Sequence, residues 1–158
     1  MLLKGRFSFF TGFMLCASSF LALQAQTPSA TAASSGVYTA AQAQQGNAAY
    51  QKQCASCHGD DLGGSGQTPP LNGDEFMTNW QGQTMGDLFE KVQTSMPADH
   101  PGTLTREQTA DLLAYLLSSN HFPAGKTDLP TDAAALKQIH IDKAPAGGSA
   151  AGAADPGK

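Results

Sequence analysis

The stretch QKQCASCHGD, residues 51–60, places Cys54 and Cys57 three positions apart and sets His58 directly after the second cysteine. The one other cysteine, Cys16, lies near the N-terminus, far from this pair. A thiol pair of this spacing serves several kinds of chemistry, and the residues around it decide which one applies.

Four uses of the pair compete. A redox-active dithiol normally sits where a strand enters a helix, but this pair closes a helical pattern and precedes a glycine-rich loop. A structural zinc site needs four ligands, and no second CxxC or suitable histidine pair follows. A plain disulfide leaves His58 unexplained. CxxCH is the short signature of covalent haem attachment, so we predict one haem c bound through Cys54 and Cys57, with His58 as an iron ligand.

The N-terminus has the pattern of a secretory signal peptide over residues 1–25. Lys4 and Arg6 precede an apolar run that ends at the small residue Ala25. An uncleaved membrane anchor is the alternative, since the run approaches the roughly 20 apolar residues that a spanning helix needs. Its polar residues favour cleavage. We expect a periplasmic protein, whose cysteine pair meets an oxidising compartment.

The net charge argues against one class of partner. Residues 1–25 hold two basic and no acidic residues, so their removal leaves 7 basic against 13 acidic residues and changes the formal charge from −4 to −6. Such a chain is not expected to bind nucleic acid. It would reach a membrane only through an uncleaved leader, and its charge suits a redox partner with a basic patch.

The rest of the chain divides into four segments. Residues 26–37 are small and polar, which is typical of a flexible leader. One domain covers 38–125. An extension over 126–143 carries a few apolar residues that are expected to lie across the domain surface, and residues 144–158 are predicted to be disordered.

The domain is predicted to contain helices and no strands. The first helix covers about 40–55, begins at Thr39 and carries Gly46 and Tyr50 on one face. A glycine inside a helix either weakens it or allows a close helix crossing. The other helices are expected at Glu75–Trp80, from Thr84 to just before Met96, and from Thr105 to Asn120.

Over about residues 38–122 the sequence resembles the class I c-type cytochromes. The resemblance rests on CASCH (54–58), TPPLNG (68–73), SMP (95–97) and the last predicted helix. It implies an all-α class I cytochrome c fold, with helices packed around one covalently attached haem.

The same resemblance implies roles for further residues. The carbonyl of Pro69 or Pro70 would accept a hydrogen bond from the histidine ring, which fixes its tautomer. Tyr115 would pack beside the glycine of the first helix, where the first and last helices cross. The indole of Trp80 would lie near the haem and bond a propionate, unless it is an ordinary core aromatic.

The second iron ligand has several candidates. They are Met77, Met85, Met96, His100, His121 and His140. Met96 lies in a predicted loop and precedes Pro97, so its thioether is free to turn into a cavity, whereas Met85 belongs to the apolar face of a helix. We predict Met96 as the ligand and His100 as its main rival.

Ligation by His58 and Met96 leaves no open position on the iron, which predicts an electron carrier and not an enzyme. The predicted apolar pocket comprises Leu62, Leu71, Phe76, Phe89, Val92, Leu104 and Leu113.

Residues 76–130 are similar to monohaem domains that accompany pyrroloquinoline-quinone dehydrogenases. This similarity implies that the protein carries electrons from a quinoprotein dehydrogenase to a respiratory acceptor such as a terminal oxidase. It would act as a monomer or as a subunit of a redox complex. The alternatives are a haem-based gas sensor or peroxidase-like protein with a labile distal ligand, and an electron-transfer subunit of a dehydrogenase complex.

Overall fold

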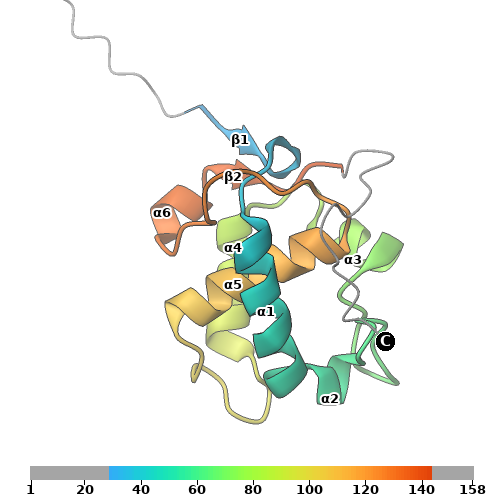
Figure 1. Ribbon diagram of the computed structural model, residues 1–158. Coiled ribbons are helices and arrows are strands. Elements are labelled where there is room, and N and C mark those ends of the chain that lie inside the picture. Colours follow the sequence, from blue (N-terminus) through green and yellow to red (C-terminus); the bar gives the residue numbers. More distant parts are fainter. Residues whose placement is uncertain (1–28, 144–158) are drawn as a thin grey trace, which may run out of the picture.

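A computed structural model describes residues 29–143 as a group of helices closed at one end by two short strands (Figure 1). The elements, in chain order, are β1 (Thr31–Ala32), the 3₁₀ helix η1 (Ala33–Ser35), α1 (Ala40–Gln53), α2 (Ala55–His58), α3 (Gly73–Trp80), α4 (Met85–Ser95), α5 (Arg106–Ser119), α6 (Ala133–Leu136) and β2 (Ile139–His140). None of the helices within 29–143 has the length and apolar character needed to cross a membrane. The predicted signal peptide and the predicted disordered tail lie outside the described residues.

Three helices begin at the threonines that the sequence predicts. Thr39, Thr84 and Thr105 each accept a hydrogen bond from the backbone N–H three residues further on. In α4 and α5 the side chains of Asp87 and Gln108 also accept a hydrogen bond from the backbone N–H of the N-cap threonine. These bonds satisfy N–H groups that the first helical turn leaves without a partner. The predicted starts of these helices are confirmed.

Helices α1 and α5 cross at Gly46 (Figure 1). A Cβ atom on Gly46 would lie 1.8 Å from the backbone oxygen of Asp111 and 2.8 Å from Cβ of Tyr115, so only glycine fits here. One turn later the ring of Tyr50 packs against that of Tyr115, with 5.3 Å between the ring centroids. The interpretation of this glycine as a close helix crossing is confirmed.

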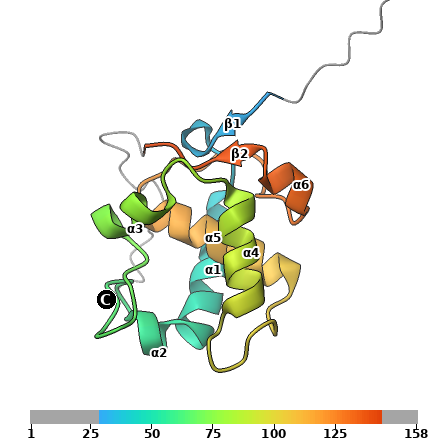
Figure 2. The same ribbon diagram turned by 180° about the vertical axis from the view of Figure 1, so that it is seen from behind.

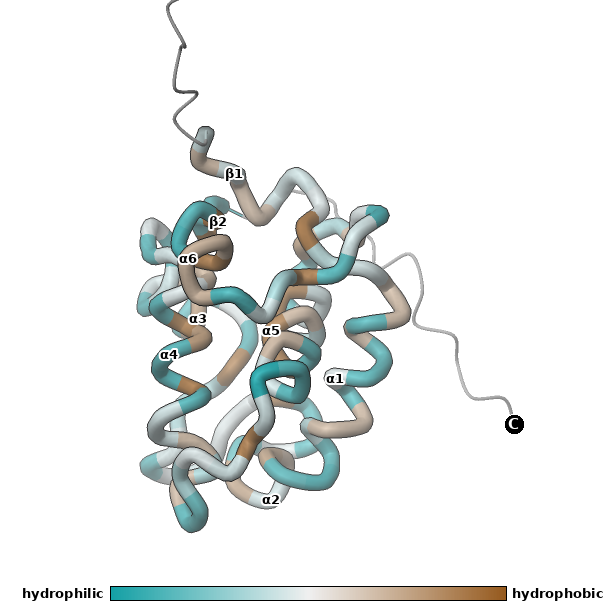
Figure 3. The backbone as a smooth tube through the Cα atoms, turned by 90° about the vertical axis from the view of Figure 1, so that its left-hand side faces the viewer, coloured by the Kyte–Doolittle hydropathy of each residue, from teal (hydrophilic) through white to brown (hydrophobic). Residues whose placement is uncertain are grey.

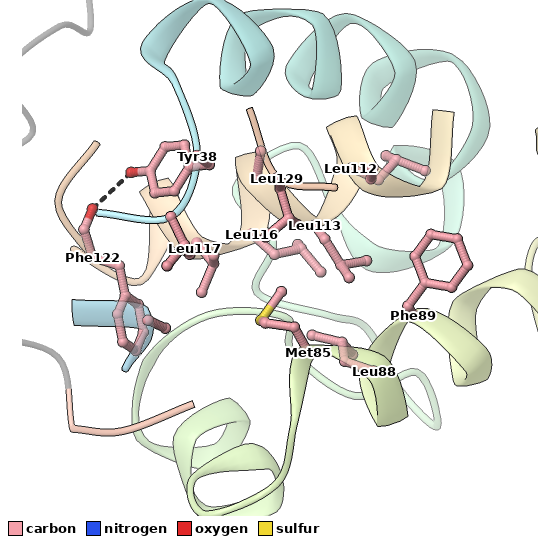
Figure 4. Packing of buried hydrophobic residues seen from close by; sticks show 14 of the residues in the cluster. Tyr38, Met85, Leu88, Phe89, Leu112, Leu113, Leu116, Leu117, Phe122 and Leu129 are labelled. Atoms are coloured by element: carbon pink, nitrogen blue, oxygen red, sulfur yellow. Dashed lines mark hydrogen bonds between the residues drawn. The ribbon is translucent and has the colours of Figure 1, made fainter. Parts of the chain in front are cut away.

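The core lies where α4 packs against α5. In Figure 4 the side chains of Met85, Leu88 and Phe89 point from α4 toward those of Leu112 and Leu113 on α5. Apolar and polar residues alternate along α4 in Figure 3, as expected of a helix with one buried face. Met85 is fully buried, which confirms its interpretation as a packing residue.

The two ends of the described chain pair with each other, which the sequence analysis did not predict. β1 lies parallel to β2, with Thr31 opposite Ile139 and Ala32 opposite His140, at the end of the molecule opposite α2 (Figures 1 and 2). Residues 31–35, assigned to a flexible leader, are therefore folded, and Ala33 is fully buried. A pairing of segments so far apart in the chain leaves no local sequence pattern.

The segment 126–143 packs onto the domain. Its buried apolar side chains are Leu129, Leu136, Ile139 and Ile141. Gln42 of α1 anchors the start of the segment, because its amide donates to Leu129 O at 3.1 Å and accepts from Leu129 N at 2.7 Å. Tyr38 similarly donates to Phe122 O at 2.7 Å (Figure 4). The two bonds of Gln42 thus hold the start of this segment against α1, while the Tyr38 bond fixes the chain just before it.

Candidate functional site

The cysteine pair lies at the junction of α1 and α2. The backbone of Cys54 has φ −126° and ψ −34°, outside the helical range, so α1 ends at Gln53 and does not continue to residue 55. The N–H groups of Cys57 and His58 both donate to Cys54 O, at 3.1 and 2.9 Å. This turn holds the two thiols and the imidazole within a single helical turn.

The ring of His58 is oriented by one backbone carbonyl. Its Nδ1 lies 3.0 Å from Pro69 O, and the residue is 9% exposed. Because a carbonyl oxygen only accepts, Nδ1 carries the proton and Nε2 of the neutral ring carries the free lone pair. The imidazole is thereby prepared to bind a metal through Nε2. Of the two prolines considered, Pro69 makes this contact.

The loop after His58 keeps the Pro69 carbonyl in place. Tyr50 donates its hydroxyl proton to Gly59 O at 2.6 Å, and Gly64 N donates to His58 O at 2.8 Å. Gly64 has φ +72°, and a Cβ there would lie 2.4 Å from the backbone oxygen of Thr68. The turn that leads back to the prolines therefore requires glycine at this position.

Asn120 holds the far end of the same loop, a role that the sequence analysis missed. Its Nδ2 donates to Leu71 O at 3.0 Å and its Oδ1 accepts from Gly73 N at 3.0 Å, while the residue is 4% exposed. An asparagine at a helix end is common, so nothing local distinguishes this residue from an ordinary C-cap.

One of the two thiols is poorly suited to dithiol exchange. Both are free; Cys54 is half-buried and Cys57 is exposed. Burial, and secondly the neighbouring Cys57, raise the pKa of the Cys54 thiol to about 11. Exchange requires a thiolate, and burial disfavours that form at Cys54. For the zinc alternative, residues 29–143 bring no group of three or more His, Cys, Asp or Glu side chains together.

Met96 is the half-buried C-cap residue of α4. Its backbone is extended, with φ −125° and ψ 150°, and its N–H donates to Val92 O at 3.0 Å. The rival His100 lies in the exposed loop that follows; its side chain is 74% exposed and its Nδ1 lies 3.1 Å from Asp99 Oδ2. The other candidates are Met77, half-buried on α3, and His121 and His140, which are exposed.

The residues predicted to line an apolar pocket belong to one cluster. Five of them lie in the core: Leu62, Phe76, Phe89, Leu104 and Leu113. Leu71 and Val92 are half-buried and pack against it. Trp80 ends α3 and is also half-buried, with its ring 6.5 Å from that of Phe76. Each of these half-buried side chains keeps some apolar surface exposed.

Part of the chain matches a known protein family. Residues 41–116 match the family model described as "Cytochrome C oxidase, cbb3-type, subunit III", just under half of the chain. The match runs from α1 to α5 and includes the cysteine pair and Met96. This stretch is therefore similar to a cytochrome c domain. Its helical architecture is the all-α class I cytochrome c fold that the sequence predicts.

A solved structure is also similar to part of this chain. It is the sulfane dehydrogenase SoxCD from Paracoccus pantotrophus, with 29% sequence identity and a TM-score of 0.47, covering 63% of this chain and 52% of that chain. The present chain thus matches about half the length of its counterpart. No curated protein gives a significant match.

A cytochrome c domain implies a covalently bound haem, and the donor set of this chain fits one. Two thiols stand within one helical turn of an imidazole whose Nδ1 is already bonded. The candidate thioether of Met96 is half-buried at the C-terminal end of α4. Cys54, Cys57 and His58 would hold the group, and the iron would supply one-electron oxidation and reduction.

Proposed function

We propose that this protein is a periplasmic electron carrier with one haem c, attached through Cys54 and Cys57 and ligated by His58 and Met96. It takes electrons from a dehydrogenase and passes them to a respiratory acceptor. The contact between His58 Nδ1 and Pro69 O carries the proposal, because it leaves Nε2 of a nearly buried imidazole free beside two thiols.

In this function the protein orients the imidazole ring of His58 and keeps water away from the haem with apolar side chains. The Pro69 carbonyl polarises the His58 ring and makes it a stronger donor to iron. A thioether from Met96 as second ligand favours the reduced state, and both ligands together close the iron to substrates. Apolar neighbours such as Leu71 and Val92 disfavour the additional positive charge of the oxidised state.

The surface suits a partner with a basic patch. Exposed carboxylates follow the cysteine pair in the chain and continue into α3 and α4: Asp60, Asp61, Asp74, Glu75, Asp87 and Glu90. Redox encounters use small interfaces and benefit from electrostatic steering. We propose a quinoprotein dehydrogenase as donor and a terminal oxidase as acceptor; the matched family description supports the second, since it names an oxidase subunit.

Replacing Met96 tests the function. The mature protein is expressed with a haem-ligation apparatus, and intact mass with a pyridine haemochrome spectrum first establishes that one haem is attached. Ferric wild-type protein should show the weak near-infrared sulfur-to-iron band and bind carbon monoxide poorly when reduced. Met96→Ala should abolish the band and bind carbon monoxide readily.

Met77→Ala is the matched control, because Met77 is the other half-buried methionine among residues 29–143. This variant should keep the band. If the wild-type protein lacks the band and binds carbon monoxide, the electron-carrier proposal is wrong and the alternative of a gas sensor or peroxidase-like protein holds. A folded mature protein that carries no haem would refute both.

A further inference from the structure

The loop that follows Met96 is closed by a side chain outside the predicted site. We infer that Gln93 is a positioning residue for Met96, because its amide ties the last turn of α4 to the start of α5. This inference rests on the proposed function, in which Met96 binds the haem iron.

Both ends of the Gln93 amide are occupied. Nε2 donates to Leu104 O at 2.6 Å, and Oε1 lies 3.1 Å from the hydroxyl oxygen of Thr109. Leu104 is 4% exposed and Thr109 is fully buried. The Thr109 hydroxyl also lies 2.9 Å from Thr105 O, so its proton is shared between two acceptors. One side chain on α4 thus contacts two points that flank the start of α5.

The chain between these points has little support of its own. Residues 98–103 are exposed. The hydrogen bonds of this segment reach no further than Pro97: His100 N donates to Pro97 O at 3.0 Å, and Thr103 donates to His100 O at 2.8 Å. The position of Met96 therefore depends on how the ends of the loop are held, and Gln93 lies three residues before Met96 at one of those ends.

A methionine ligand needs such support more than a histidine would. Its thioether is neutral and reaches the iron through three rotatable bonds, so its retention depends on where the backbone places it. Fixing both ends of a loop lowers the conformational freedom that a bound ligand must give up. Loss of the amide would also leave Leu104 O and the Thr109 hydroxyl without this partner.

Imidazole competition tests the inference on the ferric holoprotein. Added imidazole displaces a weakly held methionine from the iron, so its apparent association constant reports how firmly Met96 is retained. Gln93→Leu should raise that constant about tenfold, which corresponds to about 1.4 kcal/mol. The near-infrared band should remain visible before imidazole is added. Both readouts are independent of electron-transfer activity.

Thr94→Ala is the matched control. Thr94 is the next residue of α4, but its hydroxyl donates within the helix, to Glu90 O at 2.7 Å. This variant should leave imidazole affinity unchanged. Thr109→Val serves as a second variant, since it keeps the volume of the buried side chain and removes one of the two contacts of Gln93. It should raise the affinity by a smaller factor.

The outcomes separate the inference from the function on which it rests. If wild-type protein has the band and both Gln93→Leu and Thr109→Val bind imidazole no better than Thr94→Ala, Gln93 does not position Met96. A loss of thermal stability without a change in imidazole affinity leads to the same conclusion. If wild-type protein itself lacks the band, Met96 is not the iron ligand, and the proposed function is wrong before the role of Gln93 is tested.

Discussion

Tyr50 illustrates how one residue supports the haem-binding motif from outside it. Its side chain is 1% exposed, and its hydroxyl donates to Gly59 O, directly after His58. Burial is the largest cause that raises the pKa of Tyr50, followed by the nearby Cys54. The hydroxyl therefore stays protonated and able to donate throughout the neutral range.

We expect Tyr50→Phe to destabilise the holoprotein by about 1 kcal/mol, because the Gly59 carbonyl loses a buried donor while the ring packing remains. Denaturant titration followed by haem absorbance measures this change. Tyr115→Phe is the control, since it keeps the same ring pair and its hydroxyl has no hydrogen bond within residues 29–143. Equal stability of the two variants would show that the bond to Gly59 contributes nothing.

At the scale of single residues, a site whose residues are close in the sequence was predictable. Cys54, Cys57 and His58 meet because they share one helical turn, which no tertiary contact is needed to form. The choice between Pro69 and Pro70 was not predictable, since neighbouring carbonyls point in different directions and only the folded loop decides which one faces the ring.

Helices α4 and α5 begin with the same capping arrangement but with different chemistry. In α4 the box is closed by the carboxylate of Asp87, and in α5 by the amide of Gln108. The side-chain and backbone hydrogen bonds from Thr84 lower the pKa of Asp87 below its usual value. A carboxylate in the first turn also interacts favourably with the helix dipole.

This difference predicts a pH-dependent contribution to stability. The pKa of Asp87 is lower in the folded protein than its unfolded value of 3.8, so ionised Asp87 stabilises the fold at pH values above 3.8. This contribution is lost as the pH falls through the pKa of Asp87 in the folded protein. Asp87→Asn should therefore cost about 0.5 kcal/mol at pH 7, a modest amount because the site is exposed to solvent. The cost should shrink as the pH falls below 3.8, as shown by denaturant titrations at several pH values.

Gln108→Ala is the control for this experiment, because the amide of Gln108 does not titrate. Its effect on stability should be the same at pH 7 and at pH 3. If the cost of Asp87→Asn is equally constant, the charge of Asp87 plays no part in starting α4.

At the scale of elements, boundaries were predicted well where a cap marks them and poorly where it does not. Thr84 and Thr105 mark starts that the structure confirms. The predicted first helix ran to residue 55, whereas α1 ends at Gln53, because the backbone leaves the helical range at Cys54. No residue type near that position signals the break.

The two ends of the described residues 29–143 pack together and close the domain. α6 packs against α4, and β2 pairs with β1. Gly86 shows how close this contact is, because a Cβ there would lie 2.5 Å from Cγ and 3.0 Å from N of Lys137. The segment 126–143 therefore covers the N-terminal half of α4, the helix whose C-cap is Met96.

Truncation after residue 125 should lower the thermal midpoint of the holoprotein by about 10 °C or more, since buried leucine and isoleucine side chains and both bonds to the Gln42 amide are lost. Truncation after residue 143 is the matched control and should leave the midpoint unchanged. Calorimetry or haem absorbance on heating compares the two. Similar midpoints would mean that the segment adds no stability to the domain.

The sequence by itself determined the cofactor chemistry, the helical fold class and most helix starts, because these depend on residues within one or two helical turns of each other. Tertiary structure decided that Pro69 orients His58, that Asn120 and Gln93 hold loops, and that residues 31–35 are folded. These contacts join residues from 11 to more than 100 positions apart. A single sequence encodes such contacts only through the packing that brings the partners together.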